Sequence, residues 1–506
     1  MNETLLNNEL IILKKTVFQI FEEKGRSRMS GIQVKKEERN IIVAVMLISA
    51  FTAILNQTLL NTALPDIMRG LNIDESTSQW LVTGFMLVNG IMIPLTAYFM
   101  DRIQTRTLYM IAMGIFLLGS IIAALAPNFA ILMTARVIQA MGAGIIMPLS
   151  QFTMFSLFPK NQRGFAMGLS GLVIQFAPAI GPTLSGVLVD HFSWRVPLFV
   201  VVAVAIVGYV FGFKYMKNFS EIKQVKLDKA SVVLSTLGFG LMLYAFSIAG
   251  TVGFSNIIVI LSLIISIIII IVFVTRQLSI SNPILRLEAF KNRIFTLTSI
   301  ASMIAFTSMV GPALLIPIYI QNVLHLSAFL SGLVVLPGAI INGAMSVVTG
   351  KIYDKVGARV LIIPGFTLLL ITTLMLSQVT AHTSFTYVII VFTIRLFSIS
   401  FIMMPLNTAG INALDNDMVS HGTAIMNALR TIAGSMGTAI MVTVMAIGTK
   451  LYQPDASVSA QMIPREAMAY GVELAFYLAS GIIFLGLILS LFIHDRTKKK
   501  KNVSVR

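Results

Sequence analysis

Charged and amide side chains interrupt several long apolar stretches of this 506-residue chain. Arg136 and Gln139 lie three residues apart in one stretch, and on an α-helix that spacing places both on one face. Arg395 and Arg430 interrupt two later stretches. A buried arginine either anchors neighbouring backbone groups or binds the polar part of a small molecule, because an unpartnered guanidinium is costly in apolar surroundings. The other in-stretch polar residues predicted to line a binding cavity are Asn56, Gln57, Asn61, Asn89, Gln175, Asn342 and Asn407.

The residues that would support enzyme chemistry are missing or scattered. The sequence has no cysteine, which excludes thiolate metal sites and cysteine nucleophiles. Its five histidines show no metal-ligand spacing, and no GxxxxGK[ST] motif that would cradle a nucleotide phosphate occurs. We therefore expect no enzyme activity, no metal, no cofactor and no ATP-driven step in this chain. The histidines are His191, His325, His382, His421 and His494.

Composition identifies the class of protein. The chain is 56% hydrophobic and 11% charged, with a mean hydropathy of +0.87. Soluble domains carry about 25% charged residues, and disordered chains have low hydrophobicity, so both classes are excluded. Long apolar runs such as 257–274 exclude a membrane β-barrel, whose strands alternate over short segments. The fold class predicted is an all-α polytopic membrane protein.

A membrane-spanning helix needs about 20 mostly apolar residues. Windows of that size between charged or turn-rich breaks predict fourteen transmembrane helices, an even number that places both termini on one side. The predicted spans are 41–60, 79–99, 107–126, 130–155, 165–189, 196–213, 230–250, 255–274, 295–320, 328–350, 359–379, 385–410, 422–446 and 470–492.

The basic residues orient these spans. Of the 37 lysines and arginines, 30 fall on the side shared by the termini, 3 lie inside spans, and 4 lie on the opposite side. Cytoplasmic loops carry the excess of Lys and Arg, so both termini are predicted to be cytoplasmic in a multi-pass protein of the cell membrane. The net charge of +16 is then a feature of topology and predicts no nucleic-acid partner, while the Lys498–Lys501 run suits anionic membrane lipid. The four opposite-side residues are Arg69, Arg195, Lys450 and Arg465.

The chain repeats itself at an offset of about 255 residues, as membrane transporters often do. Asn89 recurs as Asn342 at an offset of 253, and Arg136 recurs as Arg395 at an offset of 259. Three further collinear pairs join Pro65 with Pro317, Asp101 with Asp354, and Arg163-Gly164 with His421-Gly422. The repeat predicts a cytoplasmic N-terminal segment (1–40), a six-helix bundle (41–216), two inserted helices with their loops (217–290), a second six-helix bundle (291–493) and a basic cytoplasmic tail (494–506).

The N-terminal segment leaves two interpretations open. It has no apolar core or small-residue cleavage site of a signal peptide. Weak helical periodicity over residues 5–21 is compatible with a helix lying at the membrane surface, and the alternative is that translation starts at Met29.

Two short loops carry a glycine–aspartate–arginine pattern. Gly350-x-x-x-Asp354-Lys355-x-Gly357-x-Arg359 resembles the cytoplasmic loop signature of the major facilitator superfamily. Its repeat copy keeps Asp101, Arg102 and Arg106, but Ala97 and Gln104 replace the glycines. Glycine permits close helix approach, and an aspartate at a helix end can bind the start of a neighbouring helix, so we expect a conformational latch between the two halves. A solvated turn with positive-inside charge is the alternative.

Three further segments extend this resemblance to roughly residues 40–495. Leu132-x-x-x-Arg136-x-x-Gln139-x-x-Gly142 looks like the superfamily's fourth-span motif, and Gly181-Pro182-x-x-x-Gly186 resembles the antiporter signature of its fifth span. The segment 55–65 (LNQTLLNTALP) resembles the first-span signature of the fourteen-span drug:proton antiporters, the EmrB/QacA subfamily. The resemblance implies the major facilitator fold, with two six-helix bundles plus two inserted helices around a cavity lined by the first, second, fourth and fifth helices of each half.

The resemblance also implies a function. It indicates a multidrug efflux transporter that exports small hydrophobic or amphipathic compounds by proton-coupled alternating access, acting as a monomer. The alternatives are a dedicated exporter of an endogenous lipid, signalling molecule or peptide, and a non-transporting membrane sensor or scaffold. Asn56 stands where the subfamily commonly has an aspartate, which leaves Asp66 and Glu473 as proton-coupling candidates. Each of these acids has an alternative role at a water-facing helix end.

Overall fold

The computed structural model describes residues 35–220, 222, 227–454, 459 and 461–494. Within these residues it contains fourteen α-helices long and apolar enough to cross a membrane, which confirms the predicted span count. The helices are α2 (Lys36–Leu71), α3 (Glu75–Arg102), α4 (Thr105–Ala124), α5 (Phe129–Leu157), α6 (Arg163–His191), α7 (Arg195–Tyr215), α8 (Lys229–Val252), α9 (Ile257–Ser279), α10 (Arg293–Asn322), α11 (Ala328–Val356), α12 (Arg359–Leu376), α13 (Phe385–Asn412), α14 (Val419–Leu451) and α15 (Ile463–Leu491), with short 3-10 helices at Lys160–Gln162, Leu287–Lys291 and Asn416–Met418.

Several helices are longer than the predicted windows. The predicted span 41–60 corresponds to α2 (Lys36–Leu71), which continues through Pro65. Asn72, in the left-handed conformation, caps its C-terminal end. The last helix begins before the predicted residue 470, with Pro464 in its first turn, where proline needs no hydrogen-bond partner. An apolar window marks only the part of a helix that lipid can surround, so polar end turns escape it. The predicted surface helix over 5–21 and the Lys498–Lys501 tail lie outside the described residues.

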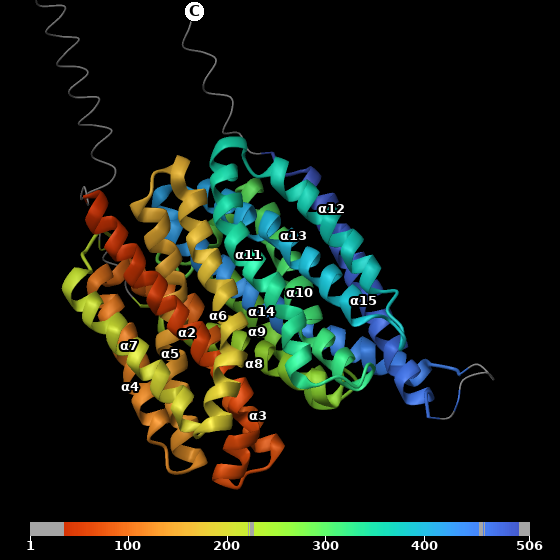
Figure 1. Ribbon diagram of the computed structural model, residues 1–506. Helices are drawn as coiled ribbons and strands as arrows, with labels where there is room; N and C mark the ends of the chain where they lie inside the picture. Colours follow the sequence, from red (N-terminus) through yellow and green to blue (C-terminus); the bar gives the residue numbers. More distant parts are fainter. Residues whose placement is uncertain (1–34, 221, 223–226, 455–458, 460, 495–506) are drawn as a thin grey trace, which may run out of the picture.

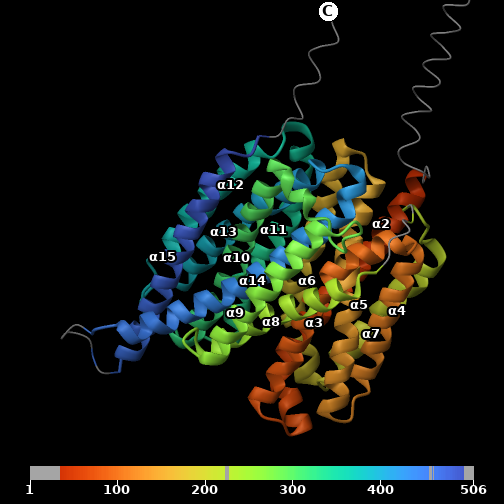
Figure 2. The same cartoon turned by 180° about the vertical axis from the view of Figure 1, so that it is seen from behind.

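The two halves pack in the same pattern. In the first half α2 packs on α6 and α7, α3 on α5, and α4 on α5 and α7; in the second half α10 packs on α14 and α15, α11 on α13, and α12 on α13 and α15. Figures 1 and 2 show these two bundles side by side, with the start of α2 and the end of α15 at the same end of the molecule. We call this end the terminal side. The repeat seen in the sequence is therefore a repeat of structure.

Individual hydrogen bonds follow the repeat as well. The Thr96 hydroxyl donates to the Gly144 carbonyl at 3.2 Å, joining α3 to α5. The Thr349 hydroxyl donates to the Ser400 carbonyl at 3.0 Å, joining α11 to α13. Both threonines are fully buried, so each bond replaces the water that the hydroxyl loses on folding.

Helices α8 and α9 form an inserted hairpin that touches both bundles. Helix α8 packs on α3 of the first bundle and α14 of the second, and its Tyr244 ring stacks on Trp80 with ring centroids 6.1 Å apart. At the base of the hairpin the Asp228 carboxylate accepts from Arg276 Nε at 2.7 Å and Nη2 at 2.9 Å. The hydrogen bonds from Arg276 hold the pKa of the Asp228 carboxyl well below its usual range, with Ser231 contributing further.

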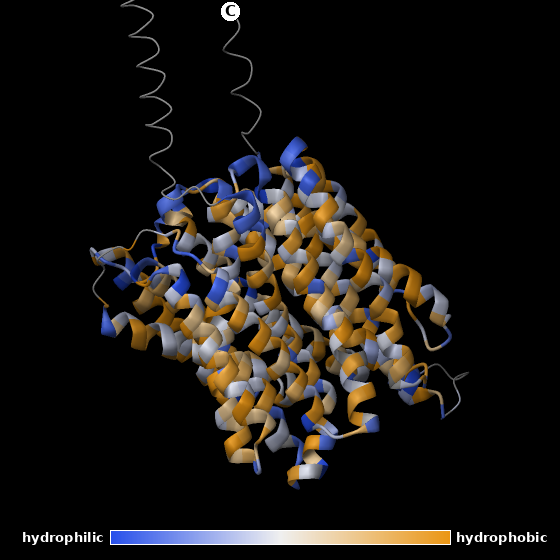
Figure 3. Cartoon of the chain, turned by 60° about the vertical axis from the view of Figure 1, so that its left-hand side comes forward, coloured by the Kyte–Doolittle hydropathy of each residue, from blue (hydrophilic) through white to orange (hydrophobic). Residues whose placement is uncertain are grey.

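Apolar residues face outward over the middle of the molecule. Figure 3 shows hydrophilic residues concentrated on the terminal side and hydrophobic residues along the flanks of the helices. Helix α9 is the extreme case, since Ile260, Ile264, Ile268 and Ile271 are exposed at helical spacing. A water-facing helix would not present such a stripe, so these side chains face lipid.

Candidate functional site

Two hydrogen bonds join the bundles on the terminal side, where α11 meets the start of α6. The Asp354 carboxylate accepts from the backbone N–H of Gly164 at 2.8 Å and of Phe165 at 2.9 Å. The first N–H groups of a helix have no partner within the helix and carry its positive dipole end, so a carboxylate is the group they bind best. One carboxylate thus caps a helix of the other bundle.

A second carboxylate makes the equivalent contact from the first bundle. Asp101, at the end of α3, accepts from the Ser420 hydroxyl at 2.9 Å and from His421 Nε2 at 3.2 Å, at the start of α14. His421 Nδ1 lies 3.3 Å from the backbone N–H of Arg286 and accepts from it, which assigns the ring proton to Nε2. The two side chains are only 9% and 3% exposed, for Asp101 and His421 respectively. We refer to Asp354 with Gly164 and Phe165, and Asp101 with Ser420 and His421, as the two latches.

The basic residues of the predicted loop signature act within a bundle. Arg106 donates through Nη2 to the Phe213 carbonyl at 2.8 Å, which closes the end of α7. Arg359 Nη1 lies 2.9 Å from His494 Nε2, beyond the end of α15. Arg102 and Lys355 are exposed, and Gly357 ends α11 with a φ of +83°, where glycine avoids a Cβ clash. The carboxylates, and not these cations, join the two bundles.

Glycines set how closely α6 and α11 approach. A Cβ at Gly350 would lie 2.2 Å from the Gly164 carbonyl oxygen, and a Cβ at Gly168 would lie 2.6 Å from that of Ser346. Farther along, Gly186 of α6 and Gly332 of α11 have no such neighbour within 4 Å in the part of the chain that the structure describes. The two helices are therefore in backbone contact on the terminal side. This is a conformation closed at the latches.

Asn56, Arg136 and Gln139 form a network inside the first bundle. Gln139 Oε1 accepts from Arg136 Nη1 at 2.9 Å and from Asn56 Nδ2 at 3.3 Å, and Arg136 Nε donates to the Leu81 carbonyl at 3.1 Å. The guanidinium also lies over the Phe85 ring, 4.1 Å from its centroid. These contacts offset an insertion cost of about 3 kcal/mol for an intramembrane arginine. All three predicted residues are fully buried and join α2, α3 and α5.

Arg395 occupies the related position in the second bundle. It donates from Nε to the Thr373 hydroxyl at 3.3 Å and from Nη2 to the Ser308 carbonyl. Asn342 on α11 and Asn407 on α13 are also buried in the second bundle, and each keeps one amide atom without a partner among the described residues: Nδ2 of Asn342 and Oδ1 of Asn407. These unpartnered amide atoms can form hydrogen bonds with a bound molecule or with water.

The remaining predicted cavity residues lie at different depths. Gln175 is half-buried and lies 3.6 Å from the Met309 sulfur of the other bundle. Gln57 and Asn89 are half-buried, while Asn61 is exposed. The structure does not bring these four together into one cluster of hydrogen bonds.

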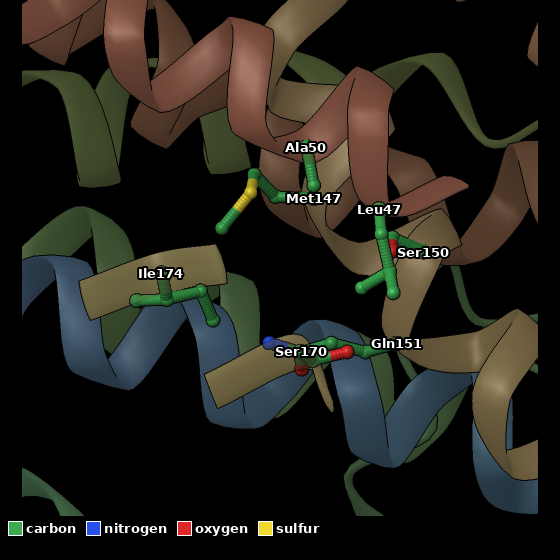
Figure 4. Close-up of a pocket in the computed structure, with 7 residues that line it drawn as sticks. All are labelled: Leu47, Ala50, Met147, Ser150, Gln151, Ser170 and Ile174. Carbon is green, nitrogen blue, oxygen red and sulfur yellow. The ribbon is translucent and has the colours of Figure 1, made fainter. Parts of the chain in front are cut away.

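A further polar contact crosses between the bundles on α5 and α14. Asn427 Nδ2 donates to Gln151 Oε1 at 2.9 Å, and Gln151 Nε2 lies 3.4 Å from Asn427 Oδ1. Gln151 also lines a small pocket between α2, α5 and α6, with Ser150 and Ser170 as its other polar residues (Figure 4). The apolar lining residues are Leu47, Ala50, Met147 and Ile174.

The antiporter-type segment of α6 packs against the first helix of its own bundle. A Cβ at Gly181 would lie 2.1 Å from the Thr58 hydroxyl, and the Ser185 hydroxyl donates to the Leu59 carbonyl at 2.8 Å. Gly186 lies one turn farther along and faces open space. Pro182 belongs to the same helix, and its side chain lies outside the described set.

The two candidate acids differ in their surroundings. Asp66 forms an ion pair with Arg69 at the exposed end of α2 on the side opposite the termini. Glu473 is partly buried in α15, and it makes no hydrogen bond or ion pair within the described portion of the chain.

Sequence reasoning missed the partners of the latch aspartates. The signal was present, because the repeat aligns His421-Gly422 with Arg163-Gly164. An aspartate that binds the start of α6 implies, by the same repeat, that Asp101 binds the start of α14.

Comparisons with known proteins agree with this architecture. A family model described as Major Facilitator Superfamily matches residues 46–438. The chain is 43% identical over 461 residues to the Uncharacterized MFS-type transporter YcnB of Bacillus subtilis (strain 168), covering 91% of this chain and 96% of YcnB. It is 41% identical over 456 residues to the Lincomycin resistance protein LmrB of the same organism, covering 89% of this chain and 95% of LmrB.

The solved structures show the same fold. The crystal structure of the human organic anion transporter MFSD10 (TETRAN) superposes with a TM-score of 0.65 at 13% identity, covering 90% of this chain and 100% of that one. With fourteen spans, two repeated six-helix bundles and these relatives, the chain belongs to the major facilitator superfamily and is a multi-pass membrane transporter, not an enzyme.

Proposed function

We propose that this transporter is a drug exporter of the cell membrane that moves hydrophobic or amphipathic compounds outward in exchange for protons. One observation supports alternating access most directly: two bundles of the same packing pattern are joined on the terminal side by reciprocal carboxylate contacts and by close glycines. Two bundles joined in this way can rock about a central site, opening one side while closing the other. Its similarity to LmrB, a lincomycin resistance protein, supports a drug as the cargo.

Purified protein in liposomes tests this proposal. A pH gradient is imposed across the membrane, and uptake of lincomycin and of a hydrophobic dye is followed into vesicles whose lumen is acidic. We expect gradient-dependent uptake of at least one compound, abolished by a protonophore. Uptake that ignores the gradient contradicts proton exchange, and no uptake of either compound, with labelled phospholipid moved instead, favours a dedicated lipid exporter.

Both ends of the chain are proposed to be cytoplasmic. Since 30 of 37 basic residues fall on the terminal side, the positive-inside rule places that side in the cytoplasm. Reporter fusions after Asn128, between α4 and α5, and after Asn218, between α7 and α8, are expected to report the outside and the cytoplasm respectively. Equal signals at the two positions contradict this orientation.

Proton coupling is proposed to run through Glu473. Asp66 already has Arg69 as its partner and faces water, whereas Glu473 lies ten residues into α15 without a partner in the described residues. A carboxylate in an apolar span is costly unless it gains a proton or a partner, which makes it suited to load and release protons. We expect Glu473→Gln to lower gradient-driven uptake at least about tenfold, and Asp66→Asn to leave it unchanged.

A second measurement on the same two variants is proton release in detergent when lincomycin is added, with both variants at equal protein concentration. Unaltered release and uptake in Glu473→Gln assign coupling to another group. If only Asp66→Asn loses proton release and gradient-driven uptake, proton coupling is assigned to Asp66 in place of Glu473.

A further inference from the structure

Arg430 is a buried cation without a counter-charge among the residues that the structure describes. It lies in α14 and is 9% exposed, so it is nine-tenths buried. Arg136 and Arg395 each donate to backbone or side-chain oxygens, but Arg430 makes no hydrogen bond, ion pair or ring contact within the residues the structure describes. Its Nε is fully buried and unsatisfied. An intramembrane charge in this condition indicates a functional site whose partner is supplied from outside the chain.

The position of Arg430 on α14 places it between the two bundles. Residues three and seven apart on a helix share a face. Asn427, three residues before Arg430, bonds to Gln151 of the first bundle. Gly434, four residues after it, lies against Phe306 of α10, where a Cβ would approach to 2.9 Å. Arg430 therefore lies on the α14 face that runs from α5 of one bundle to α10 of the other.

Its height relative to the latches follows from helix geometry. At 1.5 Å per residue, Arg430 lies about 4.5 Å farther from the terminal side than the Asn427–Gln151 contact. The Asn427–Gln151 contact joins the two bundles closer to the terminal side than Arg430, and the latches join them closer still to that side. Arg430 is therefore the charged residue of α14 directly beyond the Asn427–Gln151 contact on the side away from the latches.

A small pocket on the first-bundle side of the Asn427–Gln151 contact shows which groups lie at this part of the interface. It is lined by apolar residues together with Gln151, Ser150 and Ser170, and its lining contains no acid (Figure 4). The Ser170 hydroxyl is buried and without a partner in the described structure. The pocket has room for about one water molecule and does not itself hold a substrate, and its lining offers Arg430 no counter-charge on this side.

We propose that Arg430 binds the carboxylate of an amphipathic organic acid that enters between the two bundles. The guanidinium presents two parallel N–H groups that match the two oxygens of a carboxylate, and it stays charged throughout the physiological pH range. This inference names a substrate class for the exporter proposed above and rests on it, but binding is measured without transport.

The test compares an acid with its isosteric amide. Purified wild-type protein in detergent is titrated with radiolabelled 1-naphthaleneacetate and, separately, 1-naphthaleneacetamide in an equilibrium binding assay. We expect the acid to bind at least about tenfold more tightly than the amide, because a charge-assisted pair forms with only one of them. Equal affinity in the wild-type protein overturns the proposal, whatever any variant does.

Variants then assign the preference to one side chain. In Arg430→Gln, the affinity for the acid is expected to fall to that for the amide, while the affinity for the amide is unchanged. Arg430→Lys is expected to retain part of the preference for the acid over the amide. Lys450→Gln removes the same charge from the exposed end of the same helix and serves as the matched control. A preference that persists in Arg430→Gln, or that vanishes equally in Lys450→Gln, overturns the assignment.

Failure of this inference is distinguishable from failure of the proposed export. A preference for the acid without gradient-driven uptake in liposomes supports the site and contradicts export. Gradient-driven uptake of lincomycin with no preference for the acid supports export and overturns the role of Arg430.

Discussion

Replacing Asp354 with asparagine is expected to slow transport at least about tenfold while leaving membrane insertion intact. The Asp354 carboxylate accepts two backbone N–H groups at the start of α6, from Gly164 and Phe165. An asparagine has one acceptor oxygen and turns an NH2 group toward the second N–H, so one bond is lost and two donors face each other. Hydrogen bonds to charged groups contribute about 1.5–3 kcal/mol, and about 1.4 kcal/mol changes a two-state ratio tenfold.

The measurement is initial uptake in liposomes at equal reconstituted protein. Lys355→Gln is the matched control, because Lys355 is the next residue, is exposed and forms no hydrogen bond or ion pair in the described structure. Wild-type uptake by Asp354→Asn, at normal expression, contradicts a latch at this position.

The related variant Asp101→Asn is expected to act in the same direction but more weakly. The sequence suggested this because Ala97 and Gln104 replace the glycines in that loop. The structure adds a second reason: the partners of Asp101 are the side chains of Ser420 and His421, which can reorient, whereas backbone N–H groups cannot. A larger effect of Asp101→Asn than of Asp354→Asn contradicts this order.

The fold was predictable because it depends on hydropathy and on an internal repeat, and both can be read from the sequence. Apolar windows count the spans, and the pairs at offsets near 255 residues divide them into two related bundles. Helix ends were less predictable, since α2 continues about ten residues beyond its apolar window through Pro65 and Arg69. Polar end turns lie in water or headgroups, where hydropathy gives no signal.

The sequence predicted which polar residues belong to the candidate site, but not which residues are their hydrogen-bond partners. Arg136 and Gln139 were expected on one helix face, and they bond to each other there. That Asn56 joins them is a fact of tertiary packing, because α2 and α5 are separated by 83 residues at this contact. The same limit applies to Arg430, whose difference from the other two arginines is the lack of a partner among the described residues. Helical periodicity gives the face of a residue, and only the packed bundle gives its neighbours.

Replacing Gly350 with alanine is expected to abolish transport at normal expression. A Cβ at this position would lie 2.2 Å from the Gly164 carbonyl oxygen and 2.8 Å from the carbonyl carbon, and both atoms are backbone. A flexible side chain could move aside, but the start of α6 is held by its own helix and by Asp354. The bundles would have to separate by about an ångström or more on the terminal side, and close packing loses much of its attraction over that distance. The hydrogen bonds that Asp354 accepts from Gly164 and Phe165, at 2.8 Å and 2.9 Å, would then be stretched beyond the usual length.

Gly332→Ala provides the control on the same helix. No neighbouring heavy atom in the described chain lies within 4 Å of a Cβ built there, so the same methyl group is added to α11 without a clash. We expect Gly332→Ala to retain wild-type uptake, and a single cysteine introduced at buried Ser346, which packs against Gly168 and Gly171 of α6, to label faster from the terminal side in Gly350→Ala than in Gly332→Ala. Equal labelling with normal uptake would show that the close approach of Gly164 and Gly350 is not required for the transport cycle. Loss of uptake in both variants would instead indicate that added bulk anywhere on α11 is harmful, and would leave no special role for the terminal-side contact.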